Sequence, residues 1–113
     1  MEPKPDPRTK KNVVLIHHGH CDGADYNFIR QLACDCNLAG FQSCVMVRRG
    51  METSKLTTPT LFSIDLFNDI EVIVEELNRL FDNPNLYTVG MSMGANAVLH
   101  NSGKAGEKWP FKA

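Results

Sequence analysis

The sequence Leu86-Tyr87-Thr88-Val89-Gly90-Met91-Ser92-Met93-Gly94 joins a short apolar run to a helical pattern through a Gly-x-Ser-x-Gly pentapeptide. In that context the pentapeptide predicts a sharp strand-to-helix turn that forces the serine into a strained backbone conformation. Side chains at Gly90 and Gly94 would collide with the neighbouring strand and helix, so both positions need glycine. The turn also aims free N–H groups at an incoming acyl oxygen. Ser92 is therefore the candidate catalytic nucleophile.

Two apolar runs upstream have the length and composition of buried strands. The first, Asn12-Val13-Val14-Leu15-Ile16-His17, closes on a glycine, and the second spans Ser43 to Val47. The order βαβαβα predicts an α/β fold with three parallel strands, right-handed crossovers and helices on both faces. Residues 1–11 contain three prolines and no apolar periodicity. They are predicted to be a flexible tail, and residues 12–113 a partial domain.

Helical spacing of apolar residues predicts a helix after each strand. The first helix repeats Ile29, Leu32, Ala33 and Cys36 and ends at Gly40. The second begins near Ser63, and its apolar stripe consists of Leu66, Ile70, Ile73, Leu77, Leu80 and Phe81. The body of the third runs from Ala95 to His100. On the second helix Glu75 and Arg79 stand four residues apart, a spacing that predicts an ion pair.

The segment His18-Gly19-His20 follows the first strand. In this architecture the turn after that strand lends a backbone N–H to an oxyanion hole, and Gly19 permits the close approach to substrate. The predicted donors are the N–H groups of His20 and Met93. One such donor typically stabilises a transition state by ~3 kcal/mol, so this turn matters even though none of its side chains reacts.

The glycines and histidines also admit two other interpretations. A metal site could use His17, His18 and His20 with Cys21 and Asp22, but His17 and His18 point to opposite faces of a strand. A phosphate-binding loop would require Gly-x-Gly-x-x-Gly or Gly-Lys-Ser/Thr, and the sequence has neither. We therefore predict no metal and no cofactor.

Composition narrows the class of protein further. The chain has 113 residues, of which 42% are hydrophobic and 22% charged, and its net charge is −1. These values indicate one small globular domain and argue against a nucleic-acid partner. No apolar run approaches the ~18 residues of a membrane span, and the start of the chain is no secretory signal. The four cysteines lack Cys-x-x-Cys spacing, which favours free thiols in a cytoplasmic or other intracellular compartment.

Four short motifs follow one another along the chain: a strand that ends in His18-Gly19, then Arg49-Gly50, then Leu56-Thr57-Thr58-Pro59, and last Gly90-Met91-Ser92-Met93-Gly94-Ala95-Asn96. This arrangement resembles the α/β-hydrolase superfamily and, more narrowly, its YheT-like and embryogenesis-associated branch of esterases and lipases. The likeness runs from about Asn12 to the last residue. It implies a serine hydrolase of carboxylic esters, often acylglycerols or phospholipids, that forms an acyl-enzyme on Ser92. His20-Cys21-Asp22 and the replacement near Arg48 depart from the family pattern and put charge or bulk beside the mouth of the site.

In that family an Asp or Glu and then a His follow the serine on loops well downstream. Here 21 residues follow Ser92, and His100 lies roughly 12 Å along the same helix. The resemblance therefore implies a truncated piece of the fold with negligible activity alone. The alternative is a non-catalytic, degenerate fragment that binds a partner through the open edge of the strand before Ser92. The expected ligand is a small-molecule or lipid ester, with membrane contact only through sequence upstream of Met1.

Overall fold

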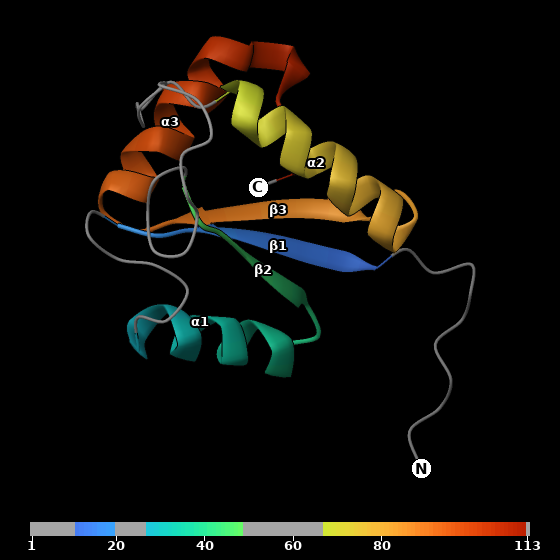
Figure 1. The fold of residues 1–113 in the computed structure, drawn as a ribbon, viewed down its shortest axis with the longest axis vertical. Helices are drawn as coiled ribbons and strands as arrows, with labels where there is room; N and C mark the ends of the chain where they lie inside the picture. The colour runs from blue at the N-terminus through green and yellow to red at the C-terminus, as the bar shows by residue number, and fades with distance from the viewer. Residues whose placement is uncertain (1–10, 20–26, 49–66, 113) are drawn as a thin grey trace.

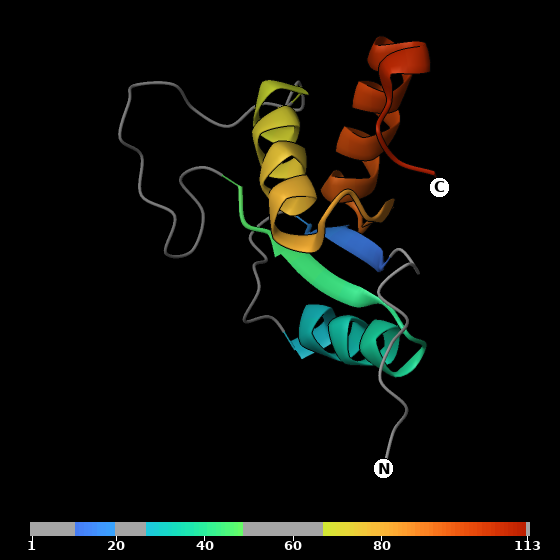
Figure 2. The same ribbon diagram turned by 90° about the vertical axis from the view of Figure 1, so that its right-hand side faces the viewer.

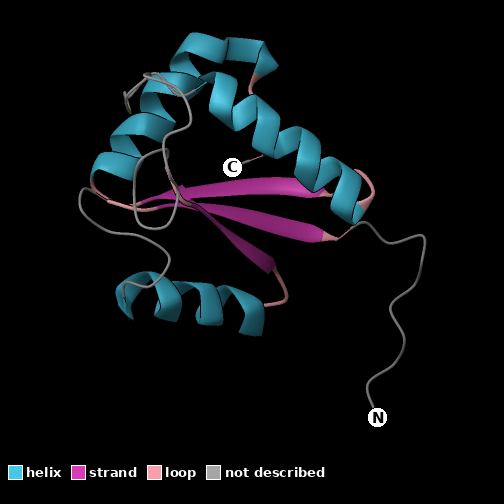
Figure 3. Ribbon diagram, in the orientation of Figure 1, coloured by secondary structure: helices cyan, strands magenta, loops and turns pink. Residues whose placement is uncertain are grey.

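The computed structural model describes residues 11–19, 27–48 and 67–112, which form one sheet and the helices that cover it (Figures 1 and 3). The elements in chain order are β1 (Asn12–His17), α1 (Asn27–Leu38), β2 (Gln42–Met46), α2 (Phe67–Phe81), β3 (Asn85–Gly90), α3 (Met93–Ala105) and a 3-10 helix, η1 (Gly106–Lys108). The predicted βαβαβα order is confirmed.

β1 is the central strand and pairs in parallel with β2 on one side and β3 on the other. His17 lies opposite Met46 of β2 and opposite Gly90 of β3, so the carboxyl ends of the strands meet at one edge. α1 covers one face of the sheet, and α2 and α3 cover the other (Figures 1 and 2). This arrangement brings together the residues that directly follow each strand.

Apolar side chains hold the helices on both faces of the sheet. The residues Val13 to Ile16 of β1 are each at most 3% exposed. A strand buried on both faces has a continuous apolar run instead of an alternating one, and the sequence of β1 fits this rule. On the face of α2 and α3 the buried cluster consists of Val13, Leu15, Met46, Ile70, Val74, Leu77, Leu86, Ala97 and Phe111. On the opposite face α1 buries Ile29. Each large side chain contributes roughly 1.5–3 kcal/mol.

α2 differs from its predicted apolar stripe at its last turn. Leu80 is 57% exposed, so its predicted place in the core is wrong. The buried residues are Ile70, Val74 and Leu77. At 100° per residue Leu80 lies roughly 80° around the helix from Ile70, whereas Phe81 lies only about 20° away and is half-buried. Residues 63–66, where the helix was predicted to begin, lie outside the described residues.

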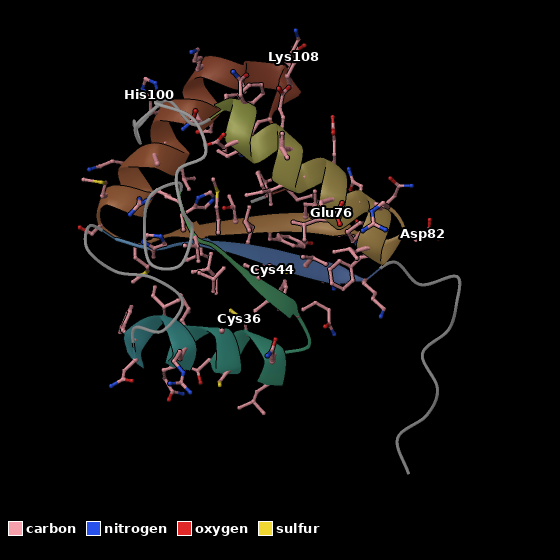
Figure 4. The ribbon with its side chains drawn as sticks, in the orientation of Figure 1. Cys36, Cys44, Glu76, Asp82, His100 and Lys108 are labelled. Atoms are coloured by element: carbon pink, nitrogen blue, oxygen red, sulfur yellow. The ribbon has the colours of Figure 1, made fainter. Side chains whose placement is uncertain are left out.

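The predicted ion pair between Glu75 and Arg79 is also wrong. Arg79 pairs with Glu76, three residues before it, through two hydrogen bonds that its Nε and Nη2 atoms donate to the carboxylate. This hydrogen bonding lowers the pKa of Glu76 and raises the pKa of Arg79. The planar guanidinium reaches both carboxylate oxygens of Glu76, which Figure 4 labels on α2, and that bidentate geometry favours this partner.

Several element ends differ by a few residues from the sequence prediction. β2 begins and ends one residue earlier than the predicted span Ser43 to Val47, and α3 extends to Ala105. Gly40 follows α1 with a φ of 97°, the left-handed conformation expected of a residue that ends a helix. The Lys11 carbonyl accepts the Asn85 N–H at 2.8 Å, so this residue, predicted to close the tail, is tied to the start of β3.

The last described residues lie along β3, whose outer edge the sequence predicted to be open. The Lys112 N–H donates to the Leu86 carbonyl oxygen at 2.7 Å. Phe111 is only 7% exposed and belongs to the core cluster. The centroid of its ring lies 5.0 Å from the ring centroid of Trp109, which also packs on the cluster. The chain therefore covers part of the edge of β3 itself.

The three described cysteines, Cys34, Cys36 and Cys44, are free thiols. Cys36 lies on α1, whereas Cys44 on β2 packs against the core cluster on the opposite face of the sheet (Figure 4). Burial raises the pKa of the Cys44 thiol, which keeps it protonated. Cys21 lies outside the described residues. None of the helices that the structure describes is long and apolar enough to cross a membrane.

Candidate active site

Ser92 occupies the turn between β3 and α3 in a backbone conformation that L-residues rarely adopt. Its φ is 54° and its ψ is −116°. Such a conformation costs on the order of 1–3 kcal/mol and persists only where the surrounding packing enforces it. The residue is exposed, and its side chain makes no cap hydrogen bond to α3. The turn therefore presents the serine hydroxyl to solvent at the edge where the parallel strands end.

Gly90 and Gly94 have no room for a side chain. A Cβ on Gly94 would lie 2.7 Å from the His18 carbonyl oxygen and closer still to the His17 carbonyl oxygen. A Cβ on Gly90 would lie 2.6 Å from the Gly94 carbonyl oxygen. The Met91 N–H donates to the His17 carbonyl oxygen at 3.0 Å, which ties the turn to the end of β1. The turn thus packs directly against the backbone that follows β1.

The Met93 N–H lies at the start of α3, directly after Ser92. Met93 is the first residue of α3, so its N–H has no acceptor within the helix. None of the carbonyls in the described ranges accepts it as a backbone hydrogen bond. It also lies at the positive end of the α3 dipole, where an oxyanion is stabilised. The other predicted donor, His20, lies outside the described residues, and Gly19 before it is buried.

His18, Gly19 and Arg48 form a buried polar cluster beside the turn. Arg48 is 1% exposed and His18 is 0% exposed, so the expectation that charge near Arg48 borders the mouth of the site is wrong for this side chain. Arg48 Nη2 donates to the Gly19 carbonyl. The Arg48 N–H lies 3.3 Å from His18 Nε2, and His18 Nδ1 lies 2.9 Å from the Gly19 oxygen. Sequence reasoning missed this cluster, whose only signal was a charged residue directly after a strand.

His17 is a buried, neutral imidazole next to this cluster. It is 1% exposed, and neither ring nitrogen has a hydrogen-bond partner within the described part of the chain. Burial, followed by the charges of Arg48 and His18, lowers the pKa of His17 from 6.5 to about 4. The ring is therefore uncharged at neutral pH, and folding resists its protonation.

We expect this histidine to destabilise the fold in mild acid. Between pH 6.5 and about 4 the unfolded chain binds a proton at His17 that the folded chain does not. Stability is thus fully present above pH 6.5 and falls as the pH drops towards 4, by about 3 kcal/mol in total. Urea unfolding at several pH values measures the loss. His17→Leu should flatten the profile, and His100→Gln, on the exposed surface of α3, should not. An unchanged profile in His17→Leu would contradict the assignment.

None of the histidines that the structure describes is placed to activate Ser92. Both ring nitrogens of His18 are engaged by Gly19 and Arg48, and His17 is buried. His100 lies on the exposed side of α3, eight residues beyond the serine (Figure 4). That spacing is roughly 12 Å of helix rise. In the described ranges no group of three His, Cys, Asp or Glu side chains could hold a metal ion. His20, Cys21 and Asp22 lie outside those ranges.

The chain is similar in sequence to several curated enzymes. It is 29% identical over 108 residues to a monoacylglycerol lipase of Saccharomyces cerevisiae, covering 95% of this chain and 24% of that protein. It is 34% identical over 102 residues to the yeast medium-chain fatty acid ethyl ester synthase/esterase 2, covering 89% of this chain and 23% of that protein. An embryogenesis-associated protein of Picea glauca is 28% identical over 99 residues, with 88% and 22% covered. The chain thus spans about a quarter of the length of these relatives.

The fold is likewise similar to that of a solved esterase structure. Est1E from Butyrivibrio proteoclasticus, solved with bound ferulic acid, superposes with a TM-score of 0.76 over 91% of this chain and 41% of that chain, at 19% identity. No protein-family model matches the chain. The sheet and its helices form part of an α/β-hydrolase fold, and in sequence the chain is similar to lipases and esterases.

Proposed function

We propose that Ser92 is the nucleophile of a carboxylic ester hydrolase. The observation that carries this proposal is the backbone of Ser92, with φ 54° and ψ −116° at the junction of β3 and α3. A turn of this kind is expensive to form and has an evident use, since it exposes the hydroxyl beside the N-terminus of a helix. The lipase and esterase names of the relatives support an ester as the substrate.

In the proposed reaction Ser92 Oγ attacks the ester carbonyl carbon. The serine proton passes to a general base, the carbonyl oxygen becomes an oxyanion, and the N–H groups of Met93 and His20 stabilise its charge. The C–O bond to the alcohol then breaks, and the base returns its proton to the departing alkoxide. Water, deprotonated by the same base, hydrolyses the acyl-enzyme and releases the acid. The base and the acid that orients it come from parts of the protein other than the described residues.

The substrate class that fits best is a fatty acyl ester, such as an acylglycerol or phospholipid. The support comes from the relatives, since one is a lipase of monoacylglycerols and another acts on medium-chain fatty acid ethyl esters by name. Catalysis of this kind requires no metal or cofactor, because the oxyanion donors and the triad supply all of the chemistry.

Fluorophosphonate labelling tests the role of Ser92. The protein expressed from the whole reading frame that encodes these residues is treated with a fluorophosphonate, digested and mapped by mass spectrometry. We expect the label on Ser92, and its loss in Ser92→Ala. Ser102→Ala is the matched control, because this serine lies on the same helix and its hydroxyl donates to the Leu99 carbonyl. Labelling elsewhere, or none on folded protein, would overturn the proposal and favour a non-catalytic binding module.

A further inference from the structure

We infer that His18 is a positioning residue, whose ring holds the stretch of backbone on which the turn at Ser92 rests. The inference deepens the proposed function and rests on it. The backbone of Ser92, with φ 54° and ψ −116°, keeps its strained conformation only where the surrounding structure enforces it. The contacts of the residues on either side of the serine show which part of the fold supplies that support.

The chain on both sides of Ser92 is held by the end of β1. Before the serine, the Met91 N–H donates to the His17 carbonyl oxygen at 3.0 Å. After it, Gly94 packs so closely on the carbonyl groups of His17 and His18 that a Cβ would lie 2.7 Å from the His18 oxygen. The carbonyl groups of these two histidines therefore support both ends of the turn, and a shift of either would move the serine hydroxyl.

The two supporting residues are themselves held in different ways. His17 is paired within the sheet, opposite Met46 of β2 and Gly90 of β3. His18 is the first residue beyond β1, one position after that pairing ends. It is 0% exposed, and its Nε2 lies 3.3 Å from the backbone nitrogen of Arg48, two residues beyond the end of β2. The imidazole thus joins the two chain segments just past the ends of their strands.

The hydrogen bonds around His18 define the protonation state of its ring. A backbone N–H can only donate, so Nε2 accepts the hydrogen bond from the Arg48 N–H. A neutral imidazole that accepts at Nε2 carries its proton on Nδ1, which donates to the Gly19 carbonyl oxygen 2.9 Å away. Arg48 Nη2 donates to the same oxygen. A side chain that replaces the imidazole must therefore place an acceptor where Nε2 lies.

Two amide substitutions at His18 test this role through the rate of fluorophosphonate labelling at Ser92, in the protein from the whole reading frame. His18→Gln carries its amide one bond further from the backbone than His18→Asn does, so it keeps an acceptor near the place of Nε2. We expect labelling of His18→Asn to be at least about tenfold slower than that of the wild type, since a misplacement of 1 Å can cost a hundredfold. His18→Gln should recover part of the rate. His100→Asn, on the exposed surface of α3, is the matched control.

The 15N chemical shifts of the His18 ring give a second test, which needs only the wild-type protein. We expect a protonated Nδ1 and an unprotonated Nε2, and an Nε2–H tautomer would overturn the inference. So would labelling of His18→Asn at the wild-type rate, or labelling of folded His18→Gln no faster than that of folded His18→Asn. If His18→Asn does not fold, the tautomer and the rate in His18→Gln decide. A folded wild type that is not labelled at Ser92 would instead overturn the proposed function, and this inference with it.

Discussion

Gly94→Ala should destabilise the fold by about 3 kcal/mol or more. The added Cβ would lie 2.7 Å from the His18 carbonyl oxygen and still closer to the His17 carbonyl oxygen. Both are backbone atoms at the end of the central strand, and the His17 oxygen already accepts the Met91 N–H. Neither oxygen can move without disrupting the sheet or the turn between β3 and α3. Urea unfolding of Gly94→Ala and the wild type gives the difference directly.

Gly103→Ala provides the control for this substitution. Gly103 lies on the same helix, and a Cβ there would meet nothing within 4 Å. Alanine is favoured over glycine inside a helix by up to about 1 kcal/mol, so this variant should be slightly more stable than the wild type. If the two variants are equally stable, the turn between β3 and α3 does not pack closely against the end of β1.

The 113-residue chain by itself should hydrolyse p-nitrophenyl esters at a rate close to background. Loss of the general base typically costs on the order of 10⁶ in kcat, and the oxyanion hole alone retains roughly 10³ to 10⁴ over water. The described histidines cannot substitute for the base, because His17 is buried, His18 is bonded at both ring nitrogens and His100 is two helical turns from Ser92.

Ser92→Ala is the control for this measurement, because it shows whether any residual rate depends on the serine. If the purified chain has a low residual rate that Ser92→Ala does not change, the rate comes from the protein surface or from contaminants. Rapid turnover that depends on Ser92 would contradict the prediction. It would mean that a base reaches the serine from residues whose positions the structure does not describe.

The order and type of the elements were predictable because their sequence signals are local. The continuous apolar run of β1 and the Gly-x-Ser-x-Gly pattern around Ser92 can each be recognised within a few consecutive residues. The fully buried Arg48 could not be predicted in this way, because its partners His18 and Gly19 are 30 and 29 residues away. The exposure of Leu80 was also unpredictable from local sequence. Helical spacing shows which residues share a face of α2, but not how wide a part of that face the sheet covers. The chemical role of Ser92 and the donor role of His20 remain predictions.

The pairing of β1 with β3 affects when this protein can fold during synthesis. Asn12 pairs with Asn85, and a side-chain hydrogen bond joins the same two residues across a separation of 73 positions. Ribosomes add about 5–20 residues per second, so the central strand is made roughly 4–15 s before its second neighbour exists. During that interval its four consecutive apolar side chains have no complete sheet to enter. Such non-local pairing slows folding and exposes the apolar side chains of β1 in the nascent chain to aggregation.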